Sequence, residues 1–263
     1  MDLGIAGKTA LITGGDSGIG WHTARLLLEE GATVVISDKD PDSLAEAASR
    51  LTGDIHHFAA DVTSVEDLAR LHEQVRSAVG EIDILVQSAG ITGAQGLFHE
   101  IDDAGWVETI EVDLLGPVRL VKEFLPDLRK GGWGRLVFLA SEDAVQPYDD
   151  ELPYCSAKAG ILALSKGLSR SYASEGLLVN AVSPAFIHTP MTDAMMEKRA
   201  DERGTDTDEA IESFLAEERP YMELGRRGEP EEVANVIAFL CSDRSGFVLG
   251  SNYRVDAGSV ATI

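Results

Sequence analysis

The sequence predicts a single α/β domain over residues 1–263, built on a doubly wound parallel sheet of about seven strands with helices on both faces. Short apolar runs alternate with longer amphipathic segments, which is the order of strands and crossover helices in a parallel sheet. Several of these runs are apolar at almost every position, as strands covered on both faces are. Because no linker, repeat or low-complexity tract interrupts this order, we expect no second domain.

Each short apolar run is expected to form one strand. The runs are 9–13 (TALIT), 33–37 (TVVIS), 55–60 (IHHFAA), 82–87 (IDILVQ), 135–140 (RLVFLA), 177–183 (LLVNAVS) and 252–255 (NYRV). Helices are expected at 18–30, 41–52, 64–79, 103–130, 154–175 and 230–242. Asp40 before Pro41, and Thr63 or Ser64 before two acidic residues, are typical helix starts. Residues 191–222 depart from this pattern as a long polar insertion that contains methionines.

Composition excludes several classes of partner. The formal net charge of −23 should repel nucleic acid and anionic membranes. The two cysteines, Cys155 and Cys241, form no CxxC pair, so we expect neither a disulfide framework nor a metal site. The start of the chain lacks the pattern of a secretory signal, and no apolar run approaches the roughly 18 residues of a membrane span. A soluble, cytoplasmic protein is expected.

The first strand is followed by a glycine-rich turn, TGGDSGIG, at residues 13–20. Ligands of an open parallel sheet bind beyond the carboxyl ends of the strands, where the helix N-terminus offers free N–H groups and the positive end of its dipole. Gly14, Gly18 and Gly20 would permit a tight turn, close approach to a pyrophosphate, and close helix–strand packing. A glycine-rich turn without a ligand would have the same sequence, so the loop alone does not decide.

The next strand ends in Asp38, 18 residues after Gly20. A carboxylate there can accept hydrogen bonds from both ribose hydroxyls of an adenosine, although an exposed strand-end aspartate is the simpler alternative. A 2′-phosphate at about 4 Å would be repelled by about 4 kcal/mol per unit charge at an effective dielectric of about 20. Asp16 adds to this repulsion and Lys39 partly offsets it. The loop and the acid together predict a Rossmann-type fold that binds NAD in preference to NADP.

Tyr154 and Lys158, in the stretch YCSAK, are spaced i to i+4 and so share one face of a helix. A free phenol has a pKa near 10 and is a poor catalyst at neutral pH. An ammonium about 5 Å away would stabilise the phenolate by on the order of 3 kcal/mol at an effective dielectric of about 20. It would therefore lower that pKa. Such a tyrosine can exchange a proton with an alcohol or a carbonyl. Taken alone, the pair could equally be a surface Tyr and Lys.

In combination, these motifs resemble the short-chain dehydrogenase/reductase family in its single-domain form. The resemblance extends over essentially the whole chain, from the TGxxxGxG loop through the YxxxK motif to GRRGEPEEVANVIAFLCS (225–242) and the closing VDAG (255–258). It implies an NAD(P)-dependent oxidoreductase that acts on CH–OH groups and has a Rossmann-type fold.

The resemblance also implies catalytic roles. Ser141, thirteen residues before Tyr154, would orient the substrate carbonyl. Tyr154 would be the acid–base, and Lys158 would also bind the nicotinamide ribose. Asp113 stands where the family usually has an asparagine that supports a water-linked proton relay. Aspartate serves as well if a backbone carbonyl holds the water, but weakens the relay if the side-chain amide matters.

Cofactor contacts follow in the same way. Asp61 and Val62 match the family's adenine-contacting pair, although Asp61 could equally begin the next helix. Gln87-Ser88-Ala89-Gly90 replaces the commoner Asn-Asn-Ala-Gly, and Asn180, Pro184, Ile187 and Thr189 match the stretch along the nicotinamide. The expected cofactor set is Gly14, Asp16, Ser17, Gly18, Ile19, Gly20, Asp38, Asp61, Val62, Ser88, Ala89, Gly90, Tyr154, Lys158, Pro184, Ile187 and Thr189.

The insertion at 191–222 carries or borders four of the five methionines, Met191, Met195, Met196 and Met222. In the family this segment covers the substrate site, which implies a lid over an apolar substrate. A helix pair packed on the core through Met195, Ile211, Phe214 and Leu215 is the compatible alternative. Glu142 and Asp143, beside Ser141, would disfavour an anionic substrate group. The expected substrate contacts are Ser141, Glu142, Tyr148, Phe186, Met191 and Met195.

Three functions follow for consideration. The first is NAD-dependent interconversion of a neutral secondary alcohol and a ketone by hydride transfer. The alternative is reduction of a 3-oxoacyl thioester on acyl carrier protein or CoA, for which Arg129, Lys130 and Arg170 would offer a small basic patch. A non-catalytic dinucleotide sensor is the third, but it would not need Tyr154 and Lys158. The family resemblance further implies a homotetramer assembled through residues 103–130, 154–175 and 245–263.

Overall fold

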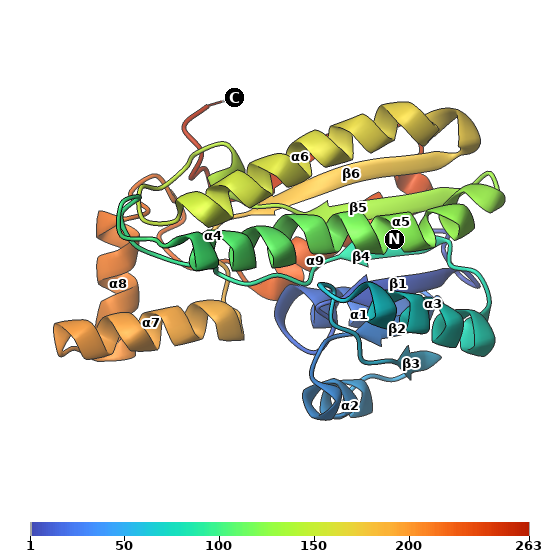
Figure 1. The fold of residues 1–263 in the computed structure, drawn as a ribbon, viewed down its shortest axis with the longest axis horizontal. Helices are drawn as coiled ribbons and strands as arrows, with labels where there is room; N and C mark the ends of the chain where they lie inside the picture. Colours follow the sequence, from blue (N-terminus) through green and yellow to red (C-terminus); the bar gives the residue numbers. More distant parts are fainter. Residues whose placement is uncertain (1, 263) are drawn as a thin grey trace.

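The computed structural model describes residues 2–262 and contains a seven-stranded parallel sheet in the order β3-β2-β1-β4-β5-β6-β7. The strands are β1 (Thr9–Thr13), β2 (Thr33–Ser37), β3 (Ile55–His57), β4 (Ile84–Gln87), β5 (Gly134–Leu139), β6 (Leu177–Pro184) and β7 (Asn252–Val255). The chain runs outward from β1 to β3, returns to the far side of β1, and runs outward again to β7 (Figure 1). The reversal between β1 and β4 is the point where open α/β sheets bind their ligands.

Helices cover both faces of the sheet (Figure 1). They are α1 (Gly18–Glu29), α2 (Pro41–Ser49), α3 (Val65–Val79), α4 (Asp103–Ile110), α5 (Gly116–Lys130), α6 (Leu152–Tyr172), α7 (Pro190–Arg203), α8 (Thr207–Glu217) and α9 (Pro230–Leu240). Alternate residues of β1 enter opposite cores: Ile12 packs with α1, α2 and α9, whereas Leu11 packs with α3, α5 and α6. The near-continuous apolar strands therefore reflect burial on both faces, as predicted.

The predicted helix starts are confirmed in detail. Asp40 caps α2 by accepting hydrogen bonds from the Asp42 and Ser43 N–H groups. Ser64, rather than Thr63, caps α3 by accepting from the Asp67 N–H. The third strand is shorter than expected, because regular pairing with β2 ends at His57. No helix within residues 2–262 is long and apolar enough to cross a bilayer.

The predicted helix at 103–130 is instead interrupted by a π-helical segment, η1 (Glu111–Leu115). The Gly116 N–H donates to the Glu111 carbonyl, five residues back. Pro117, one residue further on, has no N–H to donate to the carbonyl of Asp113 four residues before it. The α-helical ladder therefore cannot continue through this point, and the segment that carries Asp113 adopts the wider turn.

Residues 190–217 form the helix pair α7 and α8, which projects from one end of the sheet, at the left in Figure 1. The pair has a small core of its own, in which Met196, Phe214 and Met222 pack with Phe186. Met195, Ile211 and Leu215 pack against this cluster from partly buried positions. The methionines thus include core residues, as the helix-pair alternative required.

Candidate active site

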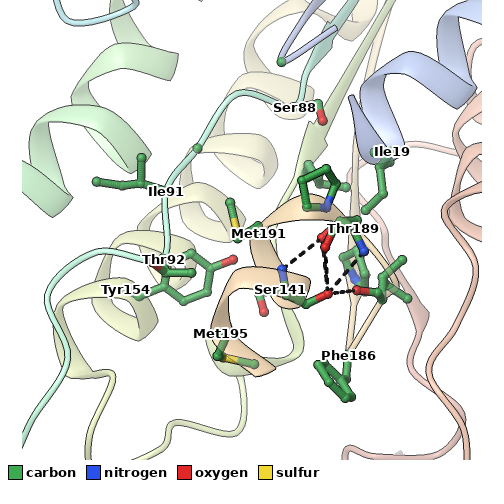
Figure 2. A pocket seen from close by; sticks show the side chains of 18 of the residues that line it. Ile19, Ser88, Ile91, Thr92, Ser141, Tyr154, Phe186, Thr189, Met191 and Met195 are labelled. Atoms are coloured by element: carbon green, nitrogen blue, oxygen red, sulfur yellow. Dashed lines mark hydrogen bonds between the residues drawn. The ribbon is translucent and has the colours of Figure 1, made fainter. Parts of the chain in front are cut away.

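A cleft of about 240 Å³ opens at the carboxyl ends of the central strands. It brings together most of the residues that the sequence nominates. These are Gly14, Asp16, Ser17, Gly18, Ile19, Gly20, Asp38, Ser88, Ala89, Gly90, Ser141, Glu142, Tyr154, Lys158, Pro184, Phe186, Ile187, Thr189, Met191 and Met195. Figure 2 shows the Tyr154 hydroxyl pointing into this space, between the loop of Ile91 and Thr92 and the helix of Met191 and Met195.

A second cavity adjoins the cleft and shares Asp38, Ala89 and Gly90 with it. Asp61 and Val62 line this cavity. Asp61 also stabilises a turn, because its Oδ1 accepts a hydrogen bond from the Thr63 N–H at 2.8 Å. It does not begin α3, whose cap is Ser64. The two cavities together form one elongated space from Asp61 to Tyr154.

The glycine-rich loop is shaped by close backbone approaches. Gly14 has φ of +68° and Gly18 has φ of +49°, a region that L side chains rarely adopt. A Cβ on Gly14 would lie 2.7 Å from the Ala89 nitrogen, and one on Gly20 would lie 2.0 Å from the Gly14 carbonyl oxygen. Helix α1 therefore starts directly against the loop, with no acidic residue in its first turn. Its free N–H groups face the cleft end of the sheet.

Asp38 and Asp16 place two carboxylates at the far end of the cleft from Tyr154. Asp38 accepts a hydrogen bond from the Lys39 N–H at 2.7 Å. Asp16 is held by the hydroxyls of Ser17 at 2.9 Å and Ser43 at 3.0 Å. Burial, and then the charge of Asp16, raise the pKa of Asp38. The two carboxylates are thus close enough for the charge of one to act on the other.

The pKa of Tyr154 differs from the expectation. Burial raises it well above its ordinary value, and the charges of Asp143 and Asp113 raise it further. The nearby Ser141 hydroxyl acts in the opposite direction. Lys158 Nζ lies 5.3 Å from the centre of the Tyr154 ring, as the helix spacing predicted, but the net shift is upward and burial is its largest cause. The prediction of a lowered pKa was therefore wrong for the protein without ligands.

Lys158 lines the cleft and Asp113 lies behind it, and both are buried. Nζ of Lys158 donates to the Leu139 carbonyl at 3.3 Å and lies 3.8 Å from Oδ1 of Asp113. The same Asp113 oxygen accepts from the Ile91 N–H at 3.0 Å, whereas Oδ2 has no hydrogen-bond partner among residues 2–262. Burial raises the pKa of Asp113, and the charge of Lys158 opposes this.

The sequence did not indicate Arg219, which is buried in the cleft wall beside three carboxylates. Its Nε donates to Glu142 Oε1 at 3.0 Å, and its Nη2 lies 4.0 Å from Asp143 and 3.9 Å from Glu151. We call these four residues the acidic cluster. Burial raises the pKa of both Glu142 and Glu151 to about 7. The only sequence signal for Arg219 was the acidic run at 142–151, whose burial demands a nearby cation.

Two predicted positions differ in the structure. Tyr148 is not in the cleft lining; it stacks on Arg219, whose guanidinium carbon lies 3.5 Å from the ring centre. Asn180 is also outside the lining, because it joins β6 to the loop before β7 through the Val248 carbonyl and the Ser251 N–H. Thr189 lines the cleft and also caps α7, where its hydroxyl accepts from the Thr192 N–H at 3.4 Å (Figure 2).

Comparison with known proteins places this site in a family. A family model described as enoyl-(acyl carrier protein) reductase matches residues 14–260. A 3-oxoacyl-(acyl-carrier-protein) reductase of Thermotoga maritima is 36% identical over 97% of this chain and 99% of its own. The chain belongs to the short-chain dehydrogenase/reductase family.

Other members of the short-chain dehydrogenase/reductase family resemble the chain equally well. A cis-4-hydroxycyclohexanecarboxylate dehydrogenase of Sinomonas cyclohexanicum is 36% identical over 99% of this chain and 100% of its own. The crystal structure of L-sorbose reductase from Gluconobacter frateurii, complexed with NADPH and L-sorbose, matches with a TM-score of 0.93 and 35% identity over 100% of both chains. These relatives act on different carbonyl and alcohol compounds, so membership shows an oxidoreductase but not the substrate.

The residues present fit the dinucleotide that the family implies. Because Gly14 and Gly20 have no Cβ, the backbone of the loop packs directly against Ala89 and against the first turn of helix α1. The elongated space has carboxylates at one end and Tyr154 at the other. Within residues 2–262, no group of three or more His, Cys, Asp or Glu side chains is arranged to hold a metal ion.

Proposed function

We propose that this protein is an NAD-dependent oxidoreductase that interconverts a neutral secondary alcohol and a ketone, with Tyr154 as the acid–base. The observation that carries the proposal is the convergence of Tyr154, Ser141 and the glycine-rich loop on one cleft. Ser88, Pro184, Ile187 and Thr189 line the path between the loop and Tyr154 and would hold the nicotinamide portion of the cofactor. When bound, the dinucleotide would accept or supply the hydride.

The chain's own residues would handle the proton. In ketone reduction, Tyr154 donates its proton to the carbonyl oxygen; in alcohol oxidation, it takes the hydroxyl proton. The raised pKa of Tyr154 keeps the phenol protonated at neutral pH in the free protein, which is the form that reduction requires. Lys158 holds a positive charge beside the ring and would stabilise the phenolate during oxidation.

NAD is the proposed cofactor because two carboxylates, Asp38 and Asp16, stand where a 2′-phosphate would approach. Two cations are also near. Lys39 lines the adjoining cavity, and Arg50 contacts the Asp16 carbonyl at 3.5 Å. These are at the surface, whereas Asp38 is half-buried and lines the cleft. NADP-dependent relatives, including the sorbose reductase bound to NADPH, make NADP the alternative.

The proposed substrate is neutral because carboxylates outnumber cations in the acidic cluster. Glu142, Asp143 and Glu151 surround a single guanidinium, that of Arg219. An anionic substrate group would be repelled there unless these acids were protonated. Phe186, Met191 and Met195 form the opposite, apolar side of the cleft. A polyol, a small cyclic alcohol or a steroid-like alcohol meets both conditions.

A 3-oxoacyl thioester remains the alternative substrate, and four of the similar proteins carry such names. The basic patch that would favour a carrier receives no support from the structure. Arg129 pairs with Glu175 at 2.7 Å, and Lys130 pairs with Glu81. Both lie at the end of α5 that leads into β5, and Arg170 is exposed near the end of α6 that leads into β6. This end of the sheet is opposite to the cleft.

We also propose that residues 191–222 act as a lid and that the protein is a cytoplasmic homotetramer. Lid function is supported by Met191 and Met195, which lie on α7 and line the cleft. Oligomerisation is supported by large apolar side chains that are exposed in this chain, among them Phe98, Val107, Leu224 and Phe247. Free Cys155 and Cys241 agree with a reducing compartment. Analytical ultracentrifugation of the wild type and F247D would test the assembly, with dissociation expected for the variant.

A substrate screen tests the proposed function. Purified protein is incubated with NAD⁺ or NADP⁺ and with sorbitol, cyclohexanol, a hydroxysteroid or 3-hydroxybutyryl-CoA, and formation of the reduced dinucleotide is followed by absorbance. We expect turnover with NAD⁺ and at least one neutral alcohol. Turnover restricted to the acyl thioester would favour the alternative, and dinucleotide binding without turnover of any alcohol or ketone would contradict the proposal.

A further inference from the structure

The hydroxyl of Ser141 is already engaged in the protein without ligands. Its Oγ donates a hydrogen bond to Oδ2 of Asp143 at 2.9 Å and accepts one from the Asp143 N–H at 3.3 Å. Both residues are buried, with 7% and 6% of their surfaces exposed. The Asp143 interaction is local and rigid, because Ser141 is the N-cap of the short helix η2 (Glu142–Ala144) that carries Asp143.

This arrangement conflicts with the role that the proposed function gives to Ser141. A hydroxyl has one proton to donate, and a ketone oxygen can only accept. While Asp143 is ionised, its carboxylate competes for that proton, and a hydrogen bond to a charged acceptor is the stronger one. A bound alcohol is less affected, because its hydroxyl donates its proton to Tyr154 and its binding does not depend on a hydrogen bond donated by Ser141.

The surroundings of Asp143 allow its charge to change. From η2 itself it faces Glu142; from α6 and the segment before it, Lys158, Tyr154, Cys155, Glu151 and Asp150; and from the turn after α8, Arg219. Oδ1 of Asp143 lies 4.0 Å from Nη2 of Arg219 and has no hydrogen-bond partner within residues 2–262. Burial raises the pKa of Asp143, while Arg219, Ser141 and Lys158 oppose the shift.

We propose that Asp143 is a positioning residue that sets which way the Ser141 hydroxyl bond points. Ionised Asp143 holds the Ser141 proton away from the cleft. A proton on Oδ2 turns Asp143 from an acceptor into a donor, and Ser141 can then donate to the substrate carbonyl. The inference rests on the proposed function, since it takes Ser141 as the group that meets the ketone oxygen.

The kinetic test compares KM values for cyclohexanone and cyclohexanol over the whole pH range in which the wild type and D143N stay folded. In the wild type, the KM for the ketone should rise with pH by about tenfold as Asp143 ionises, which corresponds to the loss of one hydrogen bond, whereas the KM for the alcohol should change little. D143N has no titrating group at this position, so its ketone KM should depend on pH much less than that of the wild type; the dependence that remains belongs to Glu142 and Glu151. D149N, an exposed residue of the same loop, is the matched control and should retain the wild-type profile. An unchanged ketone profile in D143N would overturn the proposal.

A second measurement does not depend on turnover. The side-chain carboxyl of Asp143 is titrated by carbon-13 NMR in the wild type and in S141A. Because Ser141 stabilises the ionised form, its loss should raise the pKa of Asp143; an unchanged value would show that the two residues are not linked. Y154F distinguishes failure of the proposed function from failure of the role proposed for Asp143. If Y154F retains turnover, the proposed function fails, whereas loss of turnover in Y154F with unaltered D143N and S141A results overturns only the role of Asp143.

Discussion

Oδ1 of Asp113 lies 3.8 Å from Nζ of Lys158 and accepts a hydrogen bond from the Ile91 N–H at 3.0 Å. One fully buried oxygen therefore connects the π-helical segment to the YxxxK helix and to the loop that lines the cleft. The position usually carries asparagine in the family, so this chain has placed a negative charge behind Tyr154. That charge is one of the causes that raise the pKa of Tyr154.

Asp113→Asn should shift the pH dependence of alcohol oxidation toward lower pH. The amide oxygen can still accept from Ile91, but the charge that raises the pKa of Tyr154 is gone. Initial rates measured from pH 6 to pH 10 should show the acid limb of the kcat/KM profile displaced toward lower pH. Asp113→Ala is the control for lost structure: it leaves the Ile91 N–H unpaired and should cost about 1–3 kcal/mol of unfolding free energy. Superimposable profiles for the wild type and D113N would disprove the electrostatic role.

Asp38→Ala should change cofactor preference. Removing this carboxylate abolishes the hydrogen bonds to the ribose hydroxyls and the repulsion of a 2′-phosphate, leaving Lys39 and Arg50 nearby. We expect kcat/KM to fall for NAD and to rise for NADP, so that their ratio changes by about 10- to 100-fold, equivalent to about 1.4–2.8 kcal/mol. Asp42→Ala, at an exposed position in α2, is the control. A wild-type preference for NADP would contradict the assignment of NAD from the outset.

Arg219→Met should destabilise the protein most at alkaline pH. Glu142 and Glu151 have pKa values of about 7 in the folded state, above their ordinary value of 4.5. The stability they contribute is therefore complete below about pH 4.5 and is lost as the pH rises through 7. Without Arg219, the ionised carboxylates are left uncompensated, at a cost of about 3–5 kcal/mol at pH 8, and much less at pH 5.

Urea denaturation at the two pH values measures this difference. Arg203→Met removes an exposed pair with Glu217 and should leave both midpoints nearly unchanged. Equal destabilisation of R219M at pH 5 and pH 8 would show that Arg219 acts through packing on Tyr148 and Phe214 rather than through charge.

The sheet and the site were predictable to different degrees. Strands and the glycine-rich loop followed from local patterns, since a strand buried on both faces and a strand-to-helix turn each leave a signature within a few residues. The break at Glu111–Leu115 was missed because Pro117 lies inside an otherwise regular helical pattern, where it also suits a first helical turn. The pKa of Tyr154 was misjudged mainly because the burial that raises it is set by the tertiary fold, and because Asp143 and Asp113 come from other segments. Arg219 was missed for the same reason, as its partners lie 68 or more positions away in sequence.

The lid proposal predicts a local change in backbone protection. With NAD and a neutral alcohol both bound, amides of α7 and α8 should exchange with deuterium more slowly, since the helices would close over the cleft. Peptides from α3, which does not contribute to the cleft lining, serve as the internal reference. Exchange rates in residues 190–217 that are identical with and without both ligands would argue for a fixed helix pair.

Turnover by Y154F is the most direct test of the central claim that the phenol of Tyr154 exchanges the substrate proton. The variant keeps the ring and loses only the hydroxyl. The account predicts that kcat falls by a factor on the order of 10² to 10⁴, while the NAD affinity measured by calorimetry stays within about tenfold of the wild type, a change below about 1.4 kcal/mol. Wild-type turnover in Y154F with NAD still bound would contradict it.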